Sequence, residues 1–194
     1  MKIAITGGIG SGKSFVCKRL EARGIQVYDC DREAKRLMRE SDEIRQGMQA
    51  LVGEDVYQGT ELNKPLLAKY LLQSEKNKQA VNAVVHPAVA RDFEQSGMDW
   101  LESAILFDSG FHRRVPFSFV VCVSAPEDVR VRRIVARDGI SEAKALEWIH
   151  RQMPQEQVES MSNFVILNDG VLPLEPQLEK LLGCLSLNTF TTKK

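Results

Sequence analysis

The stretch GGIGSGKS at residues 7–14 constrains this chain more than any other feature. It fits the pattern G-x-x-x-x-G-K-[ST] of a phosphate-binding loop, which needs a strand directly before it and a helix directly after it. The apolar run Ile3–Thr6 supplies the strand, and residues 13–23 carry apolar side chains at helical spacing. The sequence therefore predicts a strand–loop–helix unit, the usual opening of an α/β fold with a parallel sheet.

The chemistry of phosphate binding explains each residue type in this loop. Glycines let successive backbone N–H groups turn inward, and the positive N-terminal end of the following helix adds to their attraction for phosphate. Lys13 is expected on the β- and γ-phosphates and the Ser14 hydroxyl on Mg²⁺. The residues predicted to contact the nucleotide are Gly8, Gly10, Ser11, Gly12, Lys13, Ser14 and Phe15. The alternative is a glycine turn that binds nothing, but a chance match has a probability of about one per cent.

Composition narrows the class of protein. At 194 residues the chain is expected to be one domain, able to form a core without disulfides or a structural metal. The 26 Lys and Arg residues balance 26 Asp and Glu, which argues against a general nucleic-acid or membrane-surface binder. The four cysteines form no C-x-x-C pair and there are 3 histidines, so no zinc site is expected. No apolar run suits a signal peptide or a membrane span, which is typical of a reduced, cytoplasmic protein.

Hydrophobic periodicity continues the alternation of strands and helices along the chain. Further strands are predicted at 25–28, 100–107, 117–124 and 164–167. The block 41–97 is predicted to be mainly helical, with helices at 42–52, 65–72, 76–85 and 87–96. Other helices are expected at 31–39, 126–137, 141–153 and 173–185, followed by a frayed polar tail at 186–194.

Two missing motifs separate the kinases from other phosphate-loop proteins. A GTPase switch should carry D-x-x-G after a strand and N-K-x-D for the guanine, and the sequence has neither. A small kinase needs an acceptor site, a group on the attacking hydroxyl, and cations that cover the phosphates. The sequence offers candidates for each of these parts.

Asp29 and Asp31 are the candidates for the group on the hydroxyl. They follow the second predicted strand, and ligands of open α/β sheets bind at the carboxyl ends of strands. A spacing of two in extended chain puts both carboxylates on the same side. Asp31 can orient the acceptor hydroxyl and take its proton, or it can cap the helix beginning at Arg32. The spacing alone favours neither role.

The densest cationic stretch consists of Arg130, Arg132, Arg133 and Arg137. A run of charges is most often a solvated helix face. These arginines, however, are not confined to one helical stripe and have few acidic partners four residues away. They therefore also fit a lid that closes over a triphosphate, with Arg137 at its end.

Beyond these motifs, the sequence resembles the dephospho-CoA kinase family. The matching segments, in order, are GGIGSGKS, YDCD at 28–31, HP at 86–87, ILFDSG at 105–110, RRIVARDGIS at 132–141, QMP at 152–154 and VILNDG at 165–170. They span all but the C-terminal end of the chain. The phosphate loop alone does not separate this family from other small kinases, whereas its combination with YDCD, HP and R-x-x-x-x-R-D-G does.

The resemblance implies a three-layer α/β fold, similar to that of nucleoside monophosphate kinases, with a five-stranded parallel sheet. The core would take residues 1–40, 98–126 and 162–185, the helical acceptor-binding subdomain 41–97 and the helical lid 127–153. The implied reaction is the phosphorylation of the 3′-hydroxyl of dephospho-CoA by ATP with Mg²⁺, the last step of coenzyme A synthesis. The implied partner is this small molecule, with no nucleic acid and no membrane.

The resemblance also implies roles for individual residues. Asp31 matches the acceptor-side catalytic aspartate, and Arg137 matches the lid arginine that stabilises the transferring phosphoryl group. Asn168 falls where the family contacts adenine. His86 matches an element near the acceptor pocket, although His-Pro also fits a loop before a helix that starts at Pro87.

Four departures from the family pattern concern the acceptor side and the lid. Asp108 stands where a glutamate is common, and Lys64 where an arginine often serves the acceptor, so a bidentate contact would be lost. Trp148 replaces a frequent arginine, and Ser162-Asn163 replaces Ala-Asp. These changes affect the expected affinity for the acceptor more than the reaction.

Two other functions fit the same sequence. One is another small-molecule kinase of this fold, because cations that could bind an acceptor phosphate occur at Arg36, Arg39, Arg45, Lys64 and Arg91. The other is a nucleotide-regulated binding protein without turnover.

Overall fold

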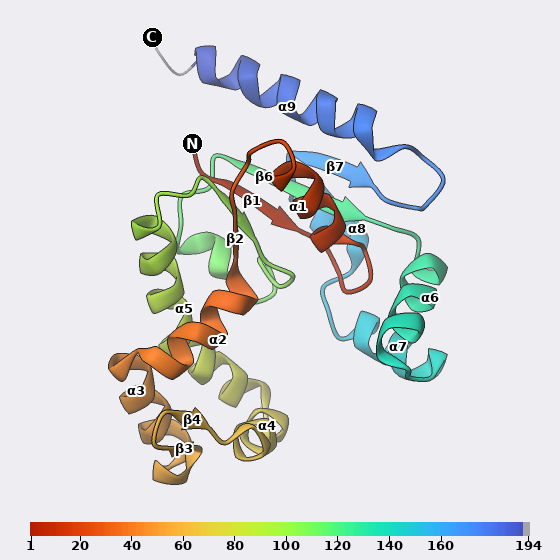
Figure 1. The fold of residues 1–194 in the computed structure, drawn as a ribbon. Helices are drawn as coiled ribbons and strands as arrows, with labels where there is room; N and C mark the ends of the chain where they lie inside the picture. The colour runs from red at the N-terminus through yellow and green to blue at the C-terminus, as the bar shows by residue number, and fades with distance from the viewer. Residues whose placement is uncertain (192–194) are drawn as a thin grey trace. The chain divides into compact units, whose positions relative to one another are not determined.

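The computed structural model, which describes residues 1–191 and the side chains of residues 1–187, contains a five-stranded parallel sheet (Figure 1). The strand order is β2-β5-β1-β6-β7. These strands are β1 (Ile3–Thr6), β2 (Val27–Asp29), β5 (Trp100–Glu102), β6 (Phe119–Ser124) and β7 (Phe164–Leu167). β1 pairs in parallel with both β5 and β6, so the phosphate loop that follows it leaves from the middle of the sheet. The predicted α/β class is confirmed.

Helices cover both sides of this sheet and make up most of the remaining chain. The longer helices are α1 (Lys13–Glu21), α2 (Cys30–Glu40), α3 (Asp42–Val52), α4 (Lys64–Gln73), α5 (Glu75–Gln95), α6 (Glu127–Asp138), α7 (Glu142–His150) and α9 (Leu174–Thr191). The shorter elements are α8 (Gln155–Ser160), the 3-10 turns η1 (Glu54–Val56) and η2 (Phe111–Arg113), and the hairpin of β3 (Tyr57–Gln58) with β4 (Glu61–Leu62).

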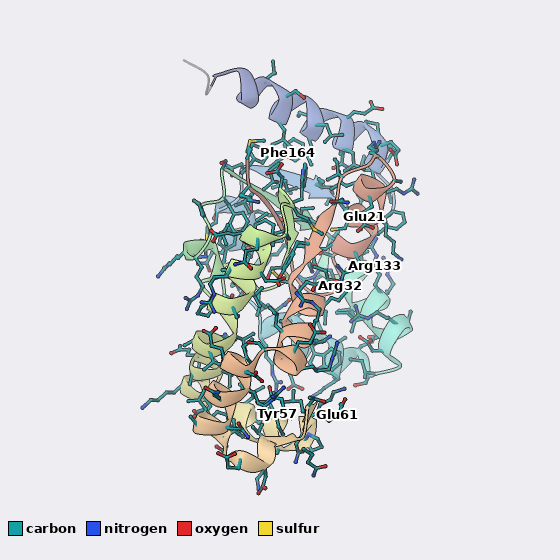
Figure 2. All side chains as sticks on the ribbon, turned by 60° about the vertical axis from the view of Figure 1, so that its left-hand side comes forward. Glu21, Arg32, Tyr57, Glu61, Arg133 and Phe164 are labelled. Atoms are coloured by element: carbon teal, nitrogen blue, oxygen red, sulfur yellow. The ribbon has the colours of Figure 1, made fainter. Side chains whose placement is uncertain are left out.

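The main core lies between one face of the sheet and the helices α1 and α9. Ile3 and Ile5 point to this face because side chains two apart in a strand lie on the same side. They pack with residues of α1 such as Leu20 and with residues of α9 such as Leu178, all of them buried. Phe164 on β7 lies against the same cluster (Figure 2). Each such side chain contributes roughly 1.5–3 kcal/mol of burial free energy, which fixes α1 and therefore the loop before it.

The chain divides into two compact units. The first is Met1–Val27 with the chain from Asp99 onward, and the second is Tyr28–Met98. The first unit contains the phosphate loop and the arginine-rich helix α6, and the second contains α2 to α5 with the small hairpin. The predicted helical insertion at 41–97 falls inside the second unit, and its assignment to the acceptor stays a prediction.

The strand predicted at 100–107 is wrong in its second half. β5 ends at Glu102, and the chain turns through residues 104–110 before η2. The apolar side chains that suggested a strand, Leu106 and Phe107, are buried without pairing to the sheet. Apolar side chains indicate that a segment is buried, but a buried turn and a buried strand can both carry them.

The break predicted at Pro87 is also wrong. α5 runs unbroken through His86 and Pro87, so the alternative in which His-Pro forms a loop before a new helix is excluded. Val85 and Val89 belong to a buried stripe at a spacing of four residues that continues on both sides of the proline. Packing of this stripe outweighs the lost backbone hydrogen bond, a cost of about 3 kcal/mol.

Smaller differences concern elements that weak patterns failed to predict. The sequence predicted neither the β3–β4 hairpin nor α8, which follows Pro154. α9 continues to Thr191, so residues 186–191 of the predicted frayed tail are helical, and residues 192–194 lie outside the described part. None of the four cysteines forms a disulfide within the described part of the chain. Within residues 1–191, no helix combines the length and the apolar character needed to cross a bilayer.

Candidate active site

The phosphate loop joins β1 to α1 through backbone that only glycine adopts readily. Gly10 and Gly12 have φ angles of +80° and +90°, and Gly12 is the N-cap of α1. A side chain at Gly12 would also collide with Asn168, because a Cβ there would lie 2.1 Å from the Asn168 Nδ2 atom. The glycines therefore let the chain turn tightly and let other parts of the protein approach it closely.

The loop presents hydrogen-bond donors that nothing in the described chain accepts. The backbone amides of Gly10, Gly12 and Ser14 donate to no described residue. The Ser11 side chain is fully buried and its Oγ atom also lacks a partner among the described residues. Unpaired donors at the first turn of a helix form an anion-binding site. This arrangement fits the phosphates of a nucleotide.

Lys13 lies at the floor of the loop with its ammonium group already oriented. Its Nζ atom donates to the carbonyl oxygen of Gly7 at 2.8 Å and lies 3.8 Å from Oε1 of Glu102. Glu102 is the last residue of β5, and sequence reasoning missed it because the strand was predicted to continue to Phe107. A correct strand end would have placed this carboxylate at the edge of the sheet where ligands bind.

The carbonyl groups of the loop are held by side chains from elsewhere in the first unit. Arg130 Nε donates to the Ile9 oxygen at 2.9 Å, and Asn168 Nδ2 donates to the Ser11 oxygen at 2.8 Å. Arg133, labelled in Figure 2, adds a bond to the Ser11 oxygen at 3.2 Å. In a trans peptide the carbonyl and the next N–H point in opposite directions. Because Arg130, Arg133 and Asn168 hold the carbonyls of Ile9 and Ser11, the N–H groups of Gly10 and Gly12 point away from these side chains, to the opposite side of the loop backbone.

The four arginines divide into two pairs. Arg132 and Arg137 are exposed and pair with Asp128 and Asp138, as a solvated helix face would. For Arg130 and Arg133 the solvated-face alternative is wrong, because both contact the loop and Arg130 is only 4% exposed. Burial lowers the pKa of Arg130, but a guanidinium stays protonated in a protein.

Arg137 lies in the last turn of α6, before the helix ends at Gly139. Its Nε and Nη2 atoms donate to the two carboxylate oxygens of Asp138, at 2.9 and 2.7 Å. The hydrogen bonds to Arg137 hold the pKa of Asp138 below its ordinary value. Because the pair is exposed, Arg137 can exchange this neighbour for another anion at small cost.

Asn168 follows β7 and is almost completely buried. Its backbone N–H donates to the Ser124 oxygen at 2.7 Å, and its side chain holds the loop as described above. The structure thus assigns Asn168 a contact to the phosphate loop that the sequence did not predict, and its predicted contact to adenine stays a prediction. Phe15, at the start of α1, is 48% exposed, and the Arg19 guanidinium lies 4.9 Å from the centre of its ring.

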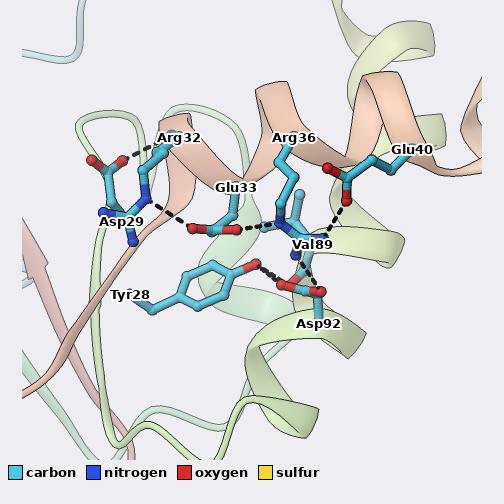
Figure 3. A network of polar contacts seen from close by, with 8 residues as sticks. All are labelled: Tyr28, Asp29, Arg32, Glu33, Arg36, Glu40, Val89 and Asp92. Carbon is cyan, nitrogen blue, oxygen red and sulfur yellow. Dashed lines mark hydrogen bonds and ion pairs between the residues drawn. The ribbon is translucent and has the colours of Figure 1, made fainter. Parts of the chain in front are cut away.

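The aspartate that caps α2 is Asp29, not Asp31. Asp29 Oδ1 accepts from the Arg32 backbone N–H at 2.9 Å, as Figure 3 shows. The capping role considered for Asp31 is therefore wrong. Asp31 stands in the first turn of α2, is exposed, and makes no hydrogen bond or ion pair with a described residue. Among the described residues, its carboxylate therefore has no partner that would compete with a substrate for hydrogen bonds.

A polar network fastens the start of α2 to α5 within the second unit (Figure 3). Asp92 on α5 accepts from Tyr28 Oη and from Arg36 Nη2, both at 2.7 Å, and Arg36 Nε also donates to Glu33 Oε2 at 2.6 Å. Burial and the bonded Asp92 raise the pKa of Tyr28. Burial acts to raise the pKa of Asp92, but its bonds from Arg36 and Tyr28 outweigh this and hold the pKa low. The backbone on either side of Asp31 is therefore well anchored.

The remaining predicted acceptor residues belong to different elements of the fold. Lys64 is the exposed first residue of α4, beside a shallow depression at the β3–β4 hairpin. His86 is half-buried within α5. Asp108 belongs to the first unit, where its Oδ1 atom accepts from the Met153 backbone N–H at 2.6 Å. Lys64 and His86, like Asp31, belong to the second unit.

Comparison with solved structures defines the class of protein. The chain of TT1252 from Thermus thermophilus is 34% identical, with a TM-score of 0.78 and 97% of each chain covered. The dephospho-CoA kinase from Campylobacter jejuni, at 19% identity, shares the fold with a TM-score of 0.65 over 97% of this chain and 100% of that one. A phosphate loop at the middle of this sheet makes the protein a P-loop kinase in fold.

Comparison with sequences specifies the family. The family model described as dephospho-CoA kinase matches residues 1–173. A dephospho-CoA kinase from Bacteroides fragilis is 44% identical over 192 residues, covering 95% of this chain and 93% of that protein. The chain belongs to the dephospho-CoA kinase family. It is a transferase that phosphorylates dephospho-CoA with ATP, in the biosynthesis of CoA.

Proposed function

We propose that the chain transfers the γ-phosphoryl group of ATP to the 3′-hydroxyl of dephospho-CoA by means of the residues described above. The observation that carries the proposal is that the amides of Gly10, Gly12 and Ser14 donate to no described residue, in a chain of this family. These donors match the oxygens of a triphosphate in charge and number of bonds. In this proposal the loop residues Gly8 to Phe15 bind ATP, and Asn168 adds a contact to the adenine.

Lys13 would exchange its bond to the Gly7 carbonyl for the β- and γ-phosphates. Its Nζ atom already lies at the floor of the loop, so little reorganisation is needed when the nucleotide arrives. A buried ammonium at this place stabilises the negative charge that develops on the leaving ADP.

The donor set also fits Mg²⁺. The Ser14 hydroxyl is exposed beside the loop, and no group of three or more His, Cys, Asp or Glu side chains within the described residues could hold a metal ion by itself. Mg²⁺ typically takes one or two protein oxygens and completes its shell with water and substrate phosphates. Bound through Ser14, it would neutralise charge on the β- and γ-phosphates.

Asp31 would orient the acceptor. The 3′-oxygen attacks the γ-phosphorus, the bond to the β–γ bridging oxygen breaks, and ADP leaves while the hydroxyl proton passes to the Asp31 carboxylate. A weak base suffices because the transition state is loose and positioning contributes most of the acceleration. His86, Lys64 and Asp108 are proposed on the acceptor side, with Lys64 as a single-point cation rather than a bidentate one. The helical block 41–97 would bind the acceptor.

Arg137 would stabilise the transferring phosphoryl group when the lid, residues 127–153, closes. Arginines in this role contribute about 10³–10⁵ in rate. Arg137→Ala should therefore lower kcat with a small change in the KM for ATP. A loss confined to KM would assign Arg137 to ground-state binding instead.

One assay tests the whole proposal. The protein is incubated with ATP, Mg²⁺ and dephospho-CoA, and the product is identified by mass and by its 3′-phosphate, with AMP and shikimate as competing acceptors. Formation of CoA and ADP is expected. Transfer to AMP or shikimate alone would favour another small-molecule kinase, and ATP binding without turnover would favour a nucleotide-regulated binding protein. The proposal includes a cytoplasmic location, without nucleic-acid or membrane partners.

A further inference from the structure

Two side chains from the region after β6 hold both backbone polar groups of Ile9, at the tip of the phosphate loop. Gln152, which follows α7, accepts from the Ile9 N–H through Oε1 at 2.7 Å. Arg130 on α6 donates from Nε to the Ile9 carbonyl at 2.9 Å. We propose that Arg130 and Gln152 are positioning residues that keep the phosphate loop in its anion-binding shape before the nucleotide arrives.

The carbonyl of Ile9 and the N–H of Gly10 belong to the same planar peptide. Because Arg130 fixes the carbonyl, it also fixes the direction of an N–H that has no partner in the described chain. An amide already oriented toward the ligand loses less conformational entropy on binding than a mobile one. Gln152 fixes the preceding peptide in the same way.

Gly8 supplies independent support, because its φ angle does not require glycine. A Cβ at Gly8 would lie 2.2 Å from Arg130 Nη2 and 3.2 Å from Gln152 Oε1. At Gly10 a Cβ would lie 2.8 Å from the Arg130 backbone oxygen. The loop is thus shaped to admit these two side chains, and a glycine at position 8 is needed for their approach.

The buried charge of Arg130 also supports this proposal. The guanidinium is buried, forms no ion pair within the described residues, and otherwise donates only to Gln155 Oε1 at 3.4 Å. Arg133 also reaches the loop carbonyls without an ion pair in that part of the chain. A buried cation without a counter-ion is costly. An anion bound in the loop lowers this cost, so Arg130 favours the nucleotide electrostatically as well.

This inference rests on the proposed function of the loop, and its test begins with ATP binding. Binding of ATP with Mg²⁺ is measured by calorimetry without dephospho-CoA, for the wild type and for Gln152→Leu and Arg130→Met. The loss of one hydrogen bond should weaken ATP binding about fivefold in Gln152→Leu. The effect should be larger, about tenfold or more, in Arg130→Met, because a charged donor is lost. Arg130→Lys, which keeps the charge, should recover part of it.

Matched controls come from exposed residues outside both the lid and the proposed contacts. Lys180→Met removes an exposed cation on α9, and Gln157→Leu makes the same exchange as Gln152→Leu on the exposed face of α8. Both should bind ATP like the wild type. The KM for dephospho-CoA should change less than twofold in every variant, and thermal denaturation should show that all of them are folded.

A double-mutant cycle separates positioning from general damage. Gly8→Ala should displace the Arg130 guanidinium and weaken ATP binding by itself. In the Arg130→Met background the same change should cost much less, because the displaced group is already absent. Additive losses, or Gln152→Leu and Arg130→Met variants that bind ATP like the controls, would overturn the inference. A wild-type protein that does not bind ATP would instead overturn the proposed function.

Discussion

At the scale of single residues, the clearest prediction concerns the effect of Lys13 on kcat/KM. Lys13→Ala removes the ammonium group held at the Gly7 carbonyl and should lower kcat/KM by roughly 10²–10³, the cost of removing one preorganised donor. Lys18→Ala, an exposed change in the same helix, is the control and should keep full activity. Steady-state kinetics with varied ATP measures both. A Lys13→Ala enzyme with near-normal kcat/KM would contradict the phosphate contact.

The two aspartates at the start of α2 should separate catalysis from stability. Asp31→Asn keeps the side-chain size, removes the base and should lower kcat sharply with little change in melting temperature or KM for ATP. Asp29→Ala removes the helix cap and should cost about 1 kcal/mol of unfolding free energy. Kinetics and denaturant titration of both variants measure the difference. An Asp31→Asn enzyme with unchanged kcat would remove Asp31 from the mechanism.

Residue spacing identified these two aspartates but could not divide their roles. Whether a carboxylate caps a helix depends on the residue at which the helix begins, and α2 begins at Cys30 instead of Arg32. Helix ends are decided by one or two hydrogen bonds, which apolar periodicity does not report. In the same way, the arginine run was visible in the sequence, but burial alone distinguishes Arg130 from the exposed Arg132.

At the scale of elements, the network between α2 and α5 predicts acid sensitivity. Bonds from Arg36 and Arg32 hold the pKa of Glu33 low, and bonds from Arg36 and Tyr28 outweigh burial to hold that of Asp92 low. A carboxyl whose folded pKa is depressed adds stability above its unfolded value, about pH 4, and this contribution is lost as the pH falls through the folded value. The melting temperature should therefore decrease as the pH is lowered below about 4.

Asp92→Ala tests the origin of this loss. The variant removes the closer acceptor of the Tyr28 hydroxyl and leaves it the Val89 oxygen at 3.5 Å, so it should cost roughly 1–3 kcal/mol at neutral pH. Its melting temperature should then depend less steeply on pH in the acid range than that of the wild type. Glu75→Ala, on the exposed start of α5, serves as the control. Equal slopes for wild type and Asp92→Ala would show that other carboxyls cause the acid sensitivity.

At the scale of the whole molecule, nucleotide binding should change the mobility of segments outside the phosphate loop. The region 127–153 is expected to be mobile without ATP and protected with it, because closure excludes water from the phosphates. The contacts of Arg130 and Arg133 tie the first half of α6 to the loop, so most of the change should occur in α7 and around Gly139. Hydrogen exchange with and without ATP measures this. Equal protection of α7 in both states would contradict a closing lid.

The local sequence determined the parts of this protein that depend on neighbours along the chain. The glycine pattern before Lys13 specifies a loop in backbone that other residues avoid, and strong apolar runs specify β1 and β6. These follow from steric and hydrophobic preferences that act within a few residues. Only the tertiary structure decided that α5 continues through Pro87, that β5 stops at Glu102, and that Arg130, Gln152 and Asn168 hold the loop. The physical reason is that burial and long-range hydrogen bonds join residues more than one hundred positions apart, and such contacts can outweigh any local preference.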